Sequence, residues 1–135
     1  MIEIIHTPPE CWPKLADAFG LKWEGNVVLT YGAQIYSPLK EIQPRTLVHE
    51  LVHVEQQKGQ NMEDWLELYL TSSDFVRDVE GPAFAAEAAF LESTITNEAE
   101  LWCKKYRLAK TMARMYRNAF TLESASGIIN LQKHG

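Results

Sequence analysis

One short motif limits how this chain can fold: residues 49–53 read HELVH, which has the pattern HExxH. Side chains four positions apart lie on one face of an α-helix, about 6 Å apart along its axis. On a helix, the imidazoles of His49 and His53 can therefore bind the same metal ion. Pro44 suits the first turn of such a helix and Gly59 marks a break after it, so we predict a helix over residues 44–58.

Glu50 has the position of a catalytic base in this motif. With 3.6 residues per turn, its side chain points about 100° away from that of His49 and about 60° away from that of His53. The carboxylate can thus reach a metal-bound water without being a ligand, which predicts Zn²⁺ as the cofactor and metal-assisted hydrolysis as the reaction. The opposite side of the helix is expected to pack into the core through Leu47, Leu51 and Val54.

A catalytic zinc usually has three protein ligands, and the third is not a nearby histidine. The longer motif HExxHxxGxxH needs glycine at position 56 and histidine at position 59, but the chain has Gln56 and Gly59. His6 and His134 remain as candidates near the two ends of the chain. A carboxylate from a later helix is therefore favoured.

The candidate carboxylates lie within residues 77–92. Glu87 stands in the apolar string AFAAEAAF, where a carboxylate needs a partner such as a cation. The small alanines around it would also permit a close approach to the helix of the two histidines. These arguments favour Glu87 as the third ligand and leave Glu80 open as the alternative.

The order of the expected elements is a small sheet followed by helices, which predicts an α+β fold in one domain over residues 1–135. Two of the strands should form a hairpin that turns at Tyr31-Gly32. A proline is expected to interrupt one of the later helices. The expected strands are residues 2–6, 27–30 and 34–36, and the expected helices are residues 9–19, 44–58, 62–71, 74–92 with a break at Gly81-Pro82, and 96–120. Residues 121–135 carry weak signals.

Composition limits the partners and the compartment. The net charge of −5 does not indicate nucleic acid as the main partner. The N-terminus lacks the features of a signal peptide, and no apolar run approaches the length of a membrane span. We therefore expect a cytoplasmic protein without a membrane partner, in which Cys11 and Cys103 are reduced and buried.

A basic segment at residues 104–117 is the one hint of a nucleic-acid or acidic partner. The alternative, favoured by the helical spacing of its apolar residues, is the solvated face of an amphipathic helix. The basic residues are Lys104, Lys105, Arg107, Lys110, Arg114 and Arg117.

The string HELVHVEQQ, with the strand-like AQIYS before it and a helical Glu-Ala after it, resembles the gluzincin metallopeptidases. The likeness covers about residues 26–92 and is greatest to their small, single-domain minigluzincin members, which include phage and bacterial zincin-like proteins. It implies that His49 and His53 bind zinc and that Glu50 is the base. In that family the third ligand is a glutamate, often followed by alanine, on a helix with a proline near its start; Pro82, Glu87 and Ala88 match this pattern, Glu80 with Ala83 is a rival match, and Glu92 is a third candidate.

The resemblance also implies a fold and an activity. A small mixed sheet would pack on the active-site helix, and its edge strand, here about residues 33–37, would receive a peptide or protein substrate by strand addition. The protein would be a zinc peptidase, and a phage-encoded one would act in the host cytoplasm. The residue that stabilises the transition state stays open among Tyr31, Tyr36, Tyr69, Tyr106 and His6.

Two other functions remain. A catalytically silent, zinc-containing binding module would keep the metal for structure and engage a host or partner protein through its helical surface. A nucleic-acid-associated protein would use the basic helix, and its binding would depend on salt.

Overall fold

The computed structural model describes residues 3–116 and 118–131. Within these ranges it contains a three-stranded sheet and six helices, which confirms the predicted α+β composition and its mostly helical second half. Two compact units make up the chain, Met1–Ser72 and Ser73–Gly135. The prediction of one domain over residues 1–135 stays a prediction.

The first unit holds the sheet and three helices. The strands are β1 (Ile4–Ile5), β2 (Leu29–Tyr31) and β3 (Gln34–Tyr36), in the order β1-β3-β2. Strand β3 pairs in parallel with β1 and antiparallel with β2. The expectation that residues 33–37 form the edge of the sheet is therefore wrong, because β1 covers the other side of β3 and leaves β1 and β2 as the edges. Residue 2, with which the expected first strand begins, lies outside the described residues.

The hairpin between β2 and β3 turns one residue later than expected. Tyr31 still pairs with Gln34, and the turn consists of Gly32 and Ala33, both with a φ of 61°. Positive φ at both positions is the pattern of the type I′ turn, which matches the twist of the flanking strands. Glycine adopts this conformation freely, whereas Ala33 needs support from its surroundings.

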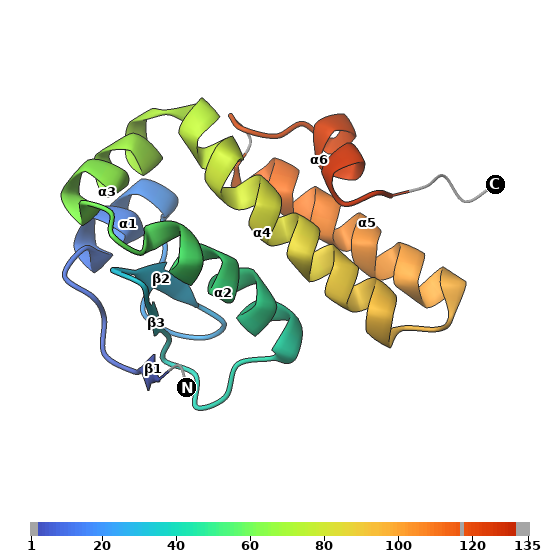
Figure 1. The fold of residues 1–135 in the computed structure, drawn as a ribbon, viewed down its shortest axis with the longest axis horizontal. Helices are drawn as coiled ribbons and strands as arrows, with labels where there is room; N and C mark the ends of the chain where they lie inside the picture. Colours follow the sequence, from blue (N-terminus) through green and yellow to red (C-terminus); the bar gives the residue numbers. More distant parts are fainter. Residues whose placement is uncertain (1–2, 117, 132–135) are drawn as a thin grey trace. The chain divides into compact units, whose positions relative to one another are not determined.

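Helix α2 (Pro44–Gln57) packs on β2 and β3, as Figure 1 shows. It matches the predicted helix 44–58 closely, and Pro44 begins it. Helices α1 (Trp12–Phe19) and α3 (Met62–Thr71) complete the unit. Asn61 is the N-cap of α3, and its side chain accepts a hydrogen bond from the backbone N–H of Asp64.

The second unit consists of α4 (Ser73–Thr94), α5 (Glu98–Met115) and α6 (Leu122–Ile128). The expected break at Gly81-Pro82 is wrong, because α4 continues through it. Proline removes one hydrogen bond to the carbonyl four residues earlier, but Pro82 and Asp78 are both exposed, so water can satisfy that carbonyl. Gly81 instead faces α6, where a Cβ would lie 3.9 Å from Ile128.

Sequence reasoning missed α6 and placed the end of α5 too late. The helix begins with reciprocal hydrogen bonds between the side chains and backbone N–H groups of Thr121 and Ser124, which form a capping box. Buried Lys105 on α5 donates to Glu92 at the end of α4 and to the carbonyl of Asn130 after α6, at 2.8 Å. This cation therefore joins all three helices of the unit.

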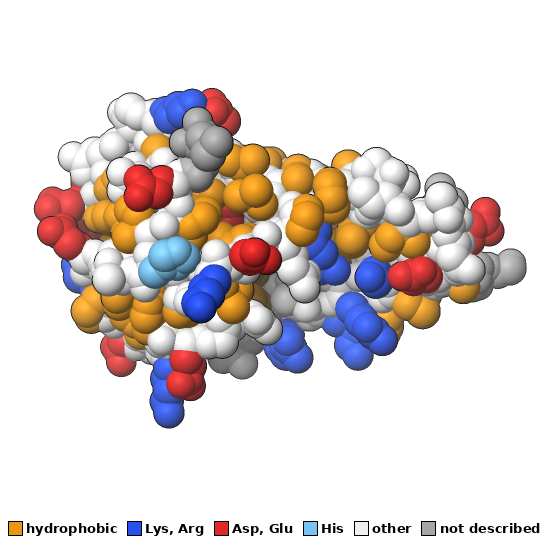
Figure 2. Space-filling model, turned by 90° about the horizontal axis from the view of Figure 1, so that it is seen from below, with side chains coloured by type: hydrophobic (Ala, Val, Ile, Leu, Met, Phe, Trp, Pro, Cys, Tyr) orange, Lys and Arg blue, Asp and Glu red, His pale blue; other side chains and the backbone are white. Residues whose placement is uncertain are grey.

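The surface carries both apolar and charged side chains, as the face in Figure 2 shows. Among the described residues, no helix is both long and apolar enough to cross a membrane. The two cysteines differ, since Cys11 is buried and Cys103 is exposed. The expectation that both are buried is wrong for Cys103, because it lies on the outer side of α5.

Candidate metal centre

Helix α2 buries one continuous arc of its surface. On a helical projection with His49 at 0°, the buried side chains fall between 0° and about 140°. Leu51 falls at about 200° and is 36% exposed, so the expected apolar anchor holds for Val54 but is wrong for Leu51. The sheet covers the side of the helix that carries Glu50 rather than the side opposite the histidines. The buried residues are His49, Glu50, His53, Val54 and Gln57.

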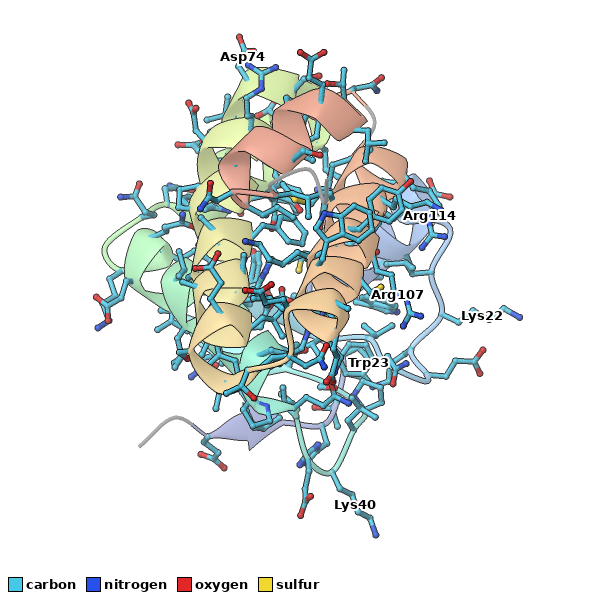
Figure 3. The ribbon with its side chains drawn as sticks, turned by 90° about the vertical axis from the view of Figure 1, so that its right-hand side faces the viewer. Lys22, Trp23, Lys40, Asp74, Arg107 and Arg114 are labelled. Carbon is cyan, nitrogen blue, oxygen red and sulfur yellow. The ribbon has the colours of Figure 1, made fainter. Side chains whose placement is uncertain are left out.

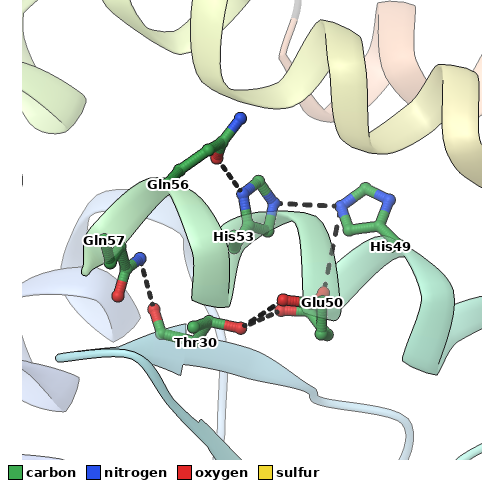
Figure 4. Close-up of polar contacts among 6 residues, drawn as sticks. All are labelled: Thr30, His49, Glu50, His53, Gln56 and Gln57. Atoms are coloured by element: carbon green, nitrogen blue, oxygen red, sulfur yellow. Dashed lines mark hydrogen bonds and ion pairs between the residues drawn. The ribbon is translucent and has the colours of Figure 1, made fainter.

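The two imidazoles of the HExxH motif point at one spot. The Nε2 atoms of His49 and His53 lie 3.2 Å apart (Figure 4). Two nitrogen ligands at about 2.05 Å from a tetrahedral zinc ion are separated by about 3.3 Å. The spacing that the helix gives these two atoms therefore fits a shared zinc ion.

A hydrogen bond determines which nitrogen of His53 is available for a metal. Its Nδ1 lies 2.8 Å from the side-chain oxygen of Gln56. An amide oxygen can only accept, so Nδ1 carries the proton and Nε2 presents a lone pair toward His49. Metal-binding histidines in proteins generally have such an acceptor on their second nitrogen.

The carboxylate of Glu50 is held between the sheet and the histidines. Its Oε1 accepts a hydrogen bond from the Thr30 hydroxyl at 3.0 Å, and its Oε2 lies 3.8 Å from Nε2 of His49. The Thr30 hydroxyl also lies 3.3 Å from the backbone carbonyl of Glu50. Oε1 is thus hydrogen-bonded to the sheet, while Oε2 faces the Nε2 atoms of the two histidines.

Gln57 fastens the hairpin to the same helix. Its side-chain nitrogen donates to the carbonyl of Thr30 at 3.0 Å, and its side-chain oxygen accepts from the N–H of Ala33 at 3.2 Å. The amide therefore satisfies two backbone groups of β2 and its turn, as a neighbouring strand would. It also supports the left-handed conformation of Ala33.

The candidate carboxylates lie on α4, in the second unit. Glu80 and Glu87 are buried, at 4% and 6% exposure, which is uncommon for glutamate unless it has partners. Glu87 lies seven positions after Glu80, so the two occupy the same face of α4 about 10 Å apart along its axis. Glu92 is exposed and binds Lys105, which gives it a structural role in that unit.

The candidates for transition-state stabilisation have varied surroundings. The ring Nδ1 of His6 donates to the carbonyl of Ser37 at 3.0 Å, and the hydroxyl of Tyr36 donates to the side-chain oxygen of Gln34 at 3.2 Å. Burial raises the pKa of Tyr31 and of Tyr36 above the usual value for tyrosine. Both hydroxyls therefore stay protonated at neutral pH and can act as donors.

Two further tyrosine candidates pack against aromatic rings. Tyr69 contacts Phe19, with ring centroids 6.1 Å apart, and Tyr106 stacks on Trp102 in the second unit, at 5.0 Å. His134, the remaining histidine candidate, lies outside the described residues.

The basic segment has mixed roles. Lys105 is a buried structural cation, Lys104 lies 3.7 Å from Glu100, and Lys110 lies over the ring of Tyr106. Arg107 and Arg114 point away from α5 on the same side (Figure 3). Arg117 lies outside the described residues. Most of these contacts are those of an ordinary amphipathic helix.

Three polar side chains of this centre were not predicted as functional: Thr30, Gln56 and Gln57. Gln56 could have been found, because a residue three positions after His53 lies on the same helical face. Thr30 and Gln57 depend on how the hairpin docks on α2, which no local pattern states. Comparisons with protein-family models, with curated proteins and with solved structures found no significant match for this chain.

Proposed function

We propose that this protein is a zincin-like, zinc-dependent hydrolase of the gluzincin type that cleaves peptide bonds. The observation that carries the proposal is the 3.2 Å separation of the His49 and His53 Nε2 atoms, beside a buried glutamate that has one oxygen directed at them. When bound, zinc supplies a Lewis acid that lowers the pKa of water and polarises a carbonyl group.

Glu50 is the proposed general base. Its Oε2 is the oxygen left facing the imidazoles, so it would accept the proton of the attacking water and pass it to the leaving amine. Its burial, at 6% exposure, excludes bulk water that would otherwise compete for this proton. With its proton held on Nδ1 by Gln56, His53 would bind the ion through Nε2, which faces His49.

For the third ligand we propose Glu80. Two imidazoles and one glutamate are a donor set found in catalytic zinc sites, and the buried His49, His53 and Glu80 could together hold a metal ion. The sequence favoured Glu87, which stays the alternative. Because both glutamates are buried on the same helix face, Glu80→Gln and Glu87→Gln are a matched pair: we expect the first to weaken zinc binding strongly and the second to leave it nearly unchanged.

The experiment that tests the activity compares two glutamates of α2, Glu50 and Glu55. Purified protein should contain about one zinc per chain by elemental analysis and should hydrolyse a mixed quenched-fluorescence peptide library. Glu50→Gln should keep the zinc and lose at least about a thousandfold in rate. Glu55→Gln, whose exposed carboxylate pairs with Lys58, should keep both. Full hydrolysis by Glu50→Gln would refute the mechanism.

A catalytically silent binding module is the second candidate. It is favoured by the low exposure of His49, Glu50 and His53, at 8%, 6% and 5%, since buried groups leave little room for a substrate to approach. This function predicts a large loss of thermal stability on chelation and no cleavage of any peptide by the zinc-loaded wild type. Cleavage that depends on Glu50 would exclude it.

A further inference from the structure

We propose that Thr30 is a positioning residue for Glu50, and that Gln57 holds Thr30 in place. The inference rests on the proposed function, because it assigns these two residues a task only if Glu50 acts as the base. The contacts themselves lie within the first unit and are drawn in Figure 4.

The contact of Thr30 selects one orientation of the Glu50 carboxylate. A buried carboxylate needs donors, and the Thr30 hydroxyl provides one at 3.0 Å to Oε1. The terminal torsion of a glutamate side chain is broad, so without a fixed donor the carboxylate would rotate. With Oε1 held on the sheet side, Oε2 is kept at 3.8 Å from Nε2 of His49.

Gln57 controls where Thr30 lies. Strand β2 is a three-residue edge strand, and Thr30 pairs with Ile35 next to the closing pair of the hairpin. Hydrogen-bonded and non-hydrogen-bonded pairs alternate in an antiparallel ladder, so the Thr30 carbonyl points away from β3. The side-chain nitrogen of Gln57 donates a hydrogen bond to that carbonyl, and its side-chain oxygen accepts one from the N–H of Ala33.

These contacts connect two residues of α2, Gln57 and Glu50, through Thr30 of β2. Gln57 lies two turns after Glu50 on α2 and fixes the backbone of Thr30, while the Thr30 hydroxyl fixes the carboxylate of Glu50. Helix α2 therefore determines the position of both Thr30 and the Glu50 carboxylate. Rigid support of this kind is what a catalytic group needs, since a misplacement of about 1 Å can cost about a hundredfold in rate.

The test removes the hydroxyl and then restores it. Thr30→Val keeps the shape of the side chain, Thr30→Ser keeps the hydroxyl, and Thr30→Ala is a second variant without it should valine not fold. Thr71→Val is the matched control, because the hydroxyl of this exposed residue donates to a backbone carbonyl of its own helix, α3. We expect kcat to fall about ten- to a hundredfold in Thr30→Val, with KM and zinc content unchanged, and to recover to within about threefold in Thr30→Ser.

A second readout needs neither zinc nor substrate. In metal-free protein labelled with carbon-13, the Cδ resonance of Glu50, assigned by its loss in Glu50→Gln, should shift or broaden in Thr30→Val and stay in place in Thr30→Ser and Thr71→Val. Gln57→Leu should speed hydrogen exchange of the Ala33 amide by about tenfold and lower kcat in the same direction.

The outcomes separate the two proposals. A wild-type kcat with an unmoved Glu50 resonance in Thr30→Val would overturn the positioning role, as would an equal loss in Thr30→Ser. If the resonance moves as expected but the wild-type protein neither binds zinc nor cleaves peptides, the contact is real, but the proposed function fails and the task of Thr30 fails with it.

Discussion

The hydrogen bond between Gln56 and His53 offers a quantitative test of the metal centre. Gln56→Leu removes the acceptor that lies 2.8 Å from Nδ1 of His53 and leaves both imidazoles in place. Loss of such an outer partner typically weakens metal binding ten- to a hundredfold. Gln56 is half-buried rather than fully buried, so water can replace part of the contact. We therefore expect a ten- to thirtyfold loss, or about 1.4–2.0 kcal/mol of zinc-binding free energy.

The assay is competition for zinc with a chelating dye at neutral pH. Gln56→Glu keeps an acceptor at the same place and should bind zinc at least as tightly as the wild type. Gln60→Leu makes the same change at an exposed position after α2 and should have no effect. The reasoning is refuted if Gln56→Leu binds zinc as tightly as the wild type, or if Gln56→Glu is as weak as Gln56→Leu.

Three further predictions concern the framework. Lys105→Met removes a buried cation with two hydrogen-bond partners and should lower the free energy of unfolding by about 1.5–3 kcal/mol in urea titrations; a loss below about 0.5 kcal/mol would contradict that role. Gly81→Ala should instead raise it by about 0.5–1 kcal/mol, because the added methyl fits at 3.9 Å from its neighbour within a helix; a destabilised variant would show that the space is tighter. Burial raises the pKa of Cys11 to about 11, so iodoacetamide near neutral pH should label Cys103 first and Cys11 only on unfolding; equal rates in mass spectra of the native protein would contradict this.

The raised pKa of Cys11 also gives a pH dependence with a definite sign. The folded protein holds the thiol proton more tightly than the unfolded chain, in which cysteine has a pKa of about 8.5. The stabilisation is therefore complete below that value and is lost as the pH rises toward about 11. Denaturant melts of the wild type and of Cys11→Ser should converge over this interval; parallel curves would show that Cys11 does not contribute.

Local sequence patterns were sufficient to predict most helices and to place His49 and His53 on one helical face. Helices α2 and α3 begin and end within a residue or so of their predicted limits, because proline, glycine and the spacing of apolar residues act over single turns. The same periodicity put His49 and His53 on one face, and the structure places their Nε2 atoms 3.2 Å apart. Helix α6 was missed because its capping box uses Ser124 where glutamate or glutamine is usual.

Tertiary contacts decided what those patterns could not reach. Whether a proline ends a helix depends on its surroundings in the fold: Pro82 and Asp78, four residues before it, are both exposed, so water can satisfy the carbonyl that loses its helical hydrogen bond. Which strand is an edge depends on pairing between residues 31 positions apart, as between Ile4 and Ile35. Neither the continuation of α4 through Pro82 nor the order of the strands can be predicted from the residues of one helical turn or one strand.

The sequence by itself determined which polar groups α2 brings together, because the helical repeat places two imidazoles and a carboxylate on neighbouring parts of its surface. Only the tertiary structure decided how those groups are oriented. The Thr30 hydroxyl reaches Glu50 of α2 from the hairpin, and the Gln57 amide of α2 reaches back to the hairpin, across 20 and 27 residues of sequence. Such contacts form only when the chain folds back on itself, and the geometry of that return follows from packing over the whole unit rather than from any local preference.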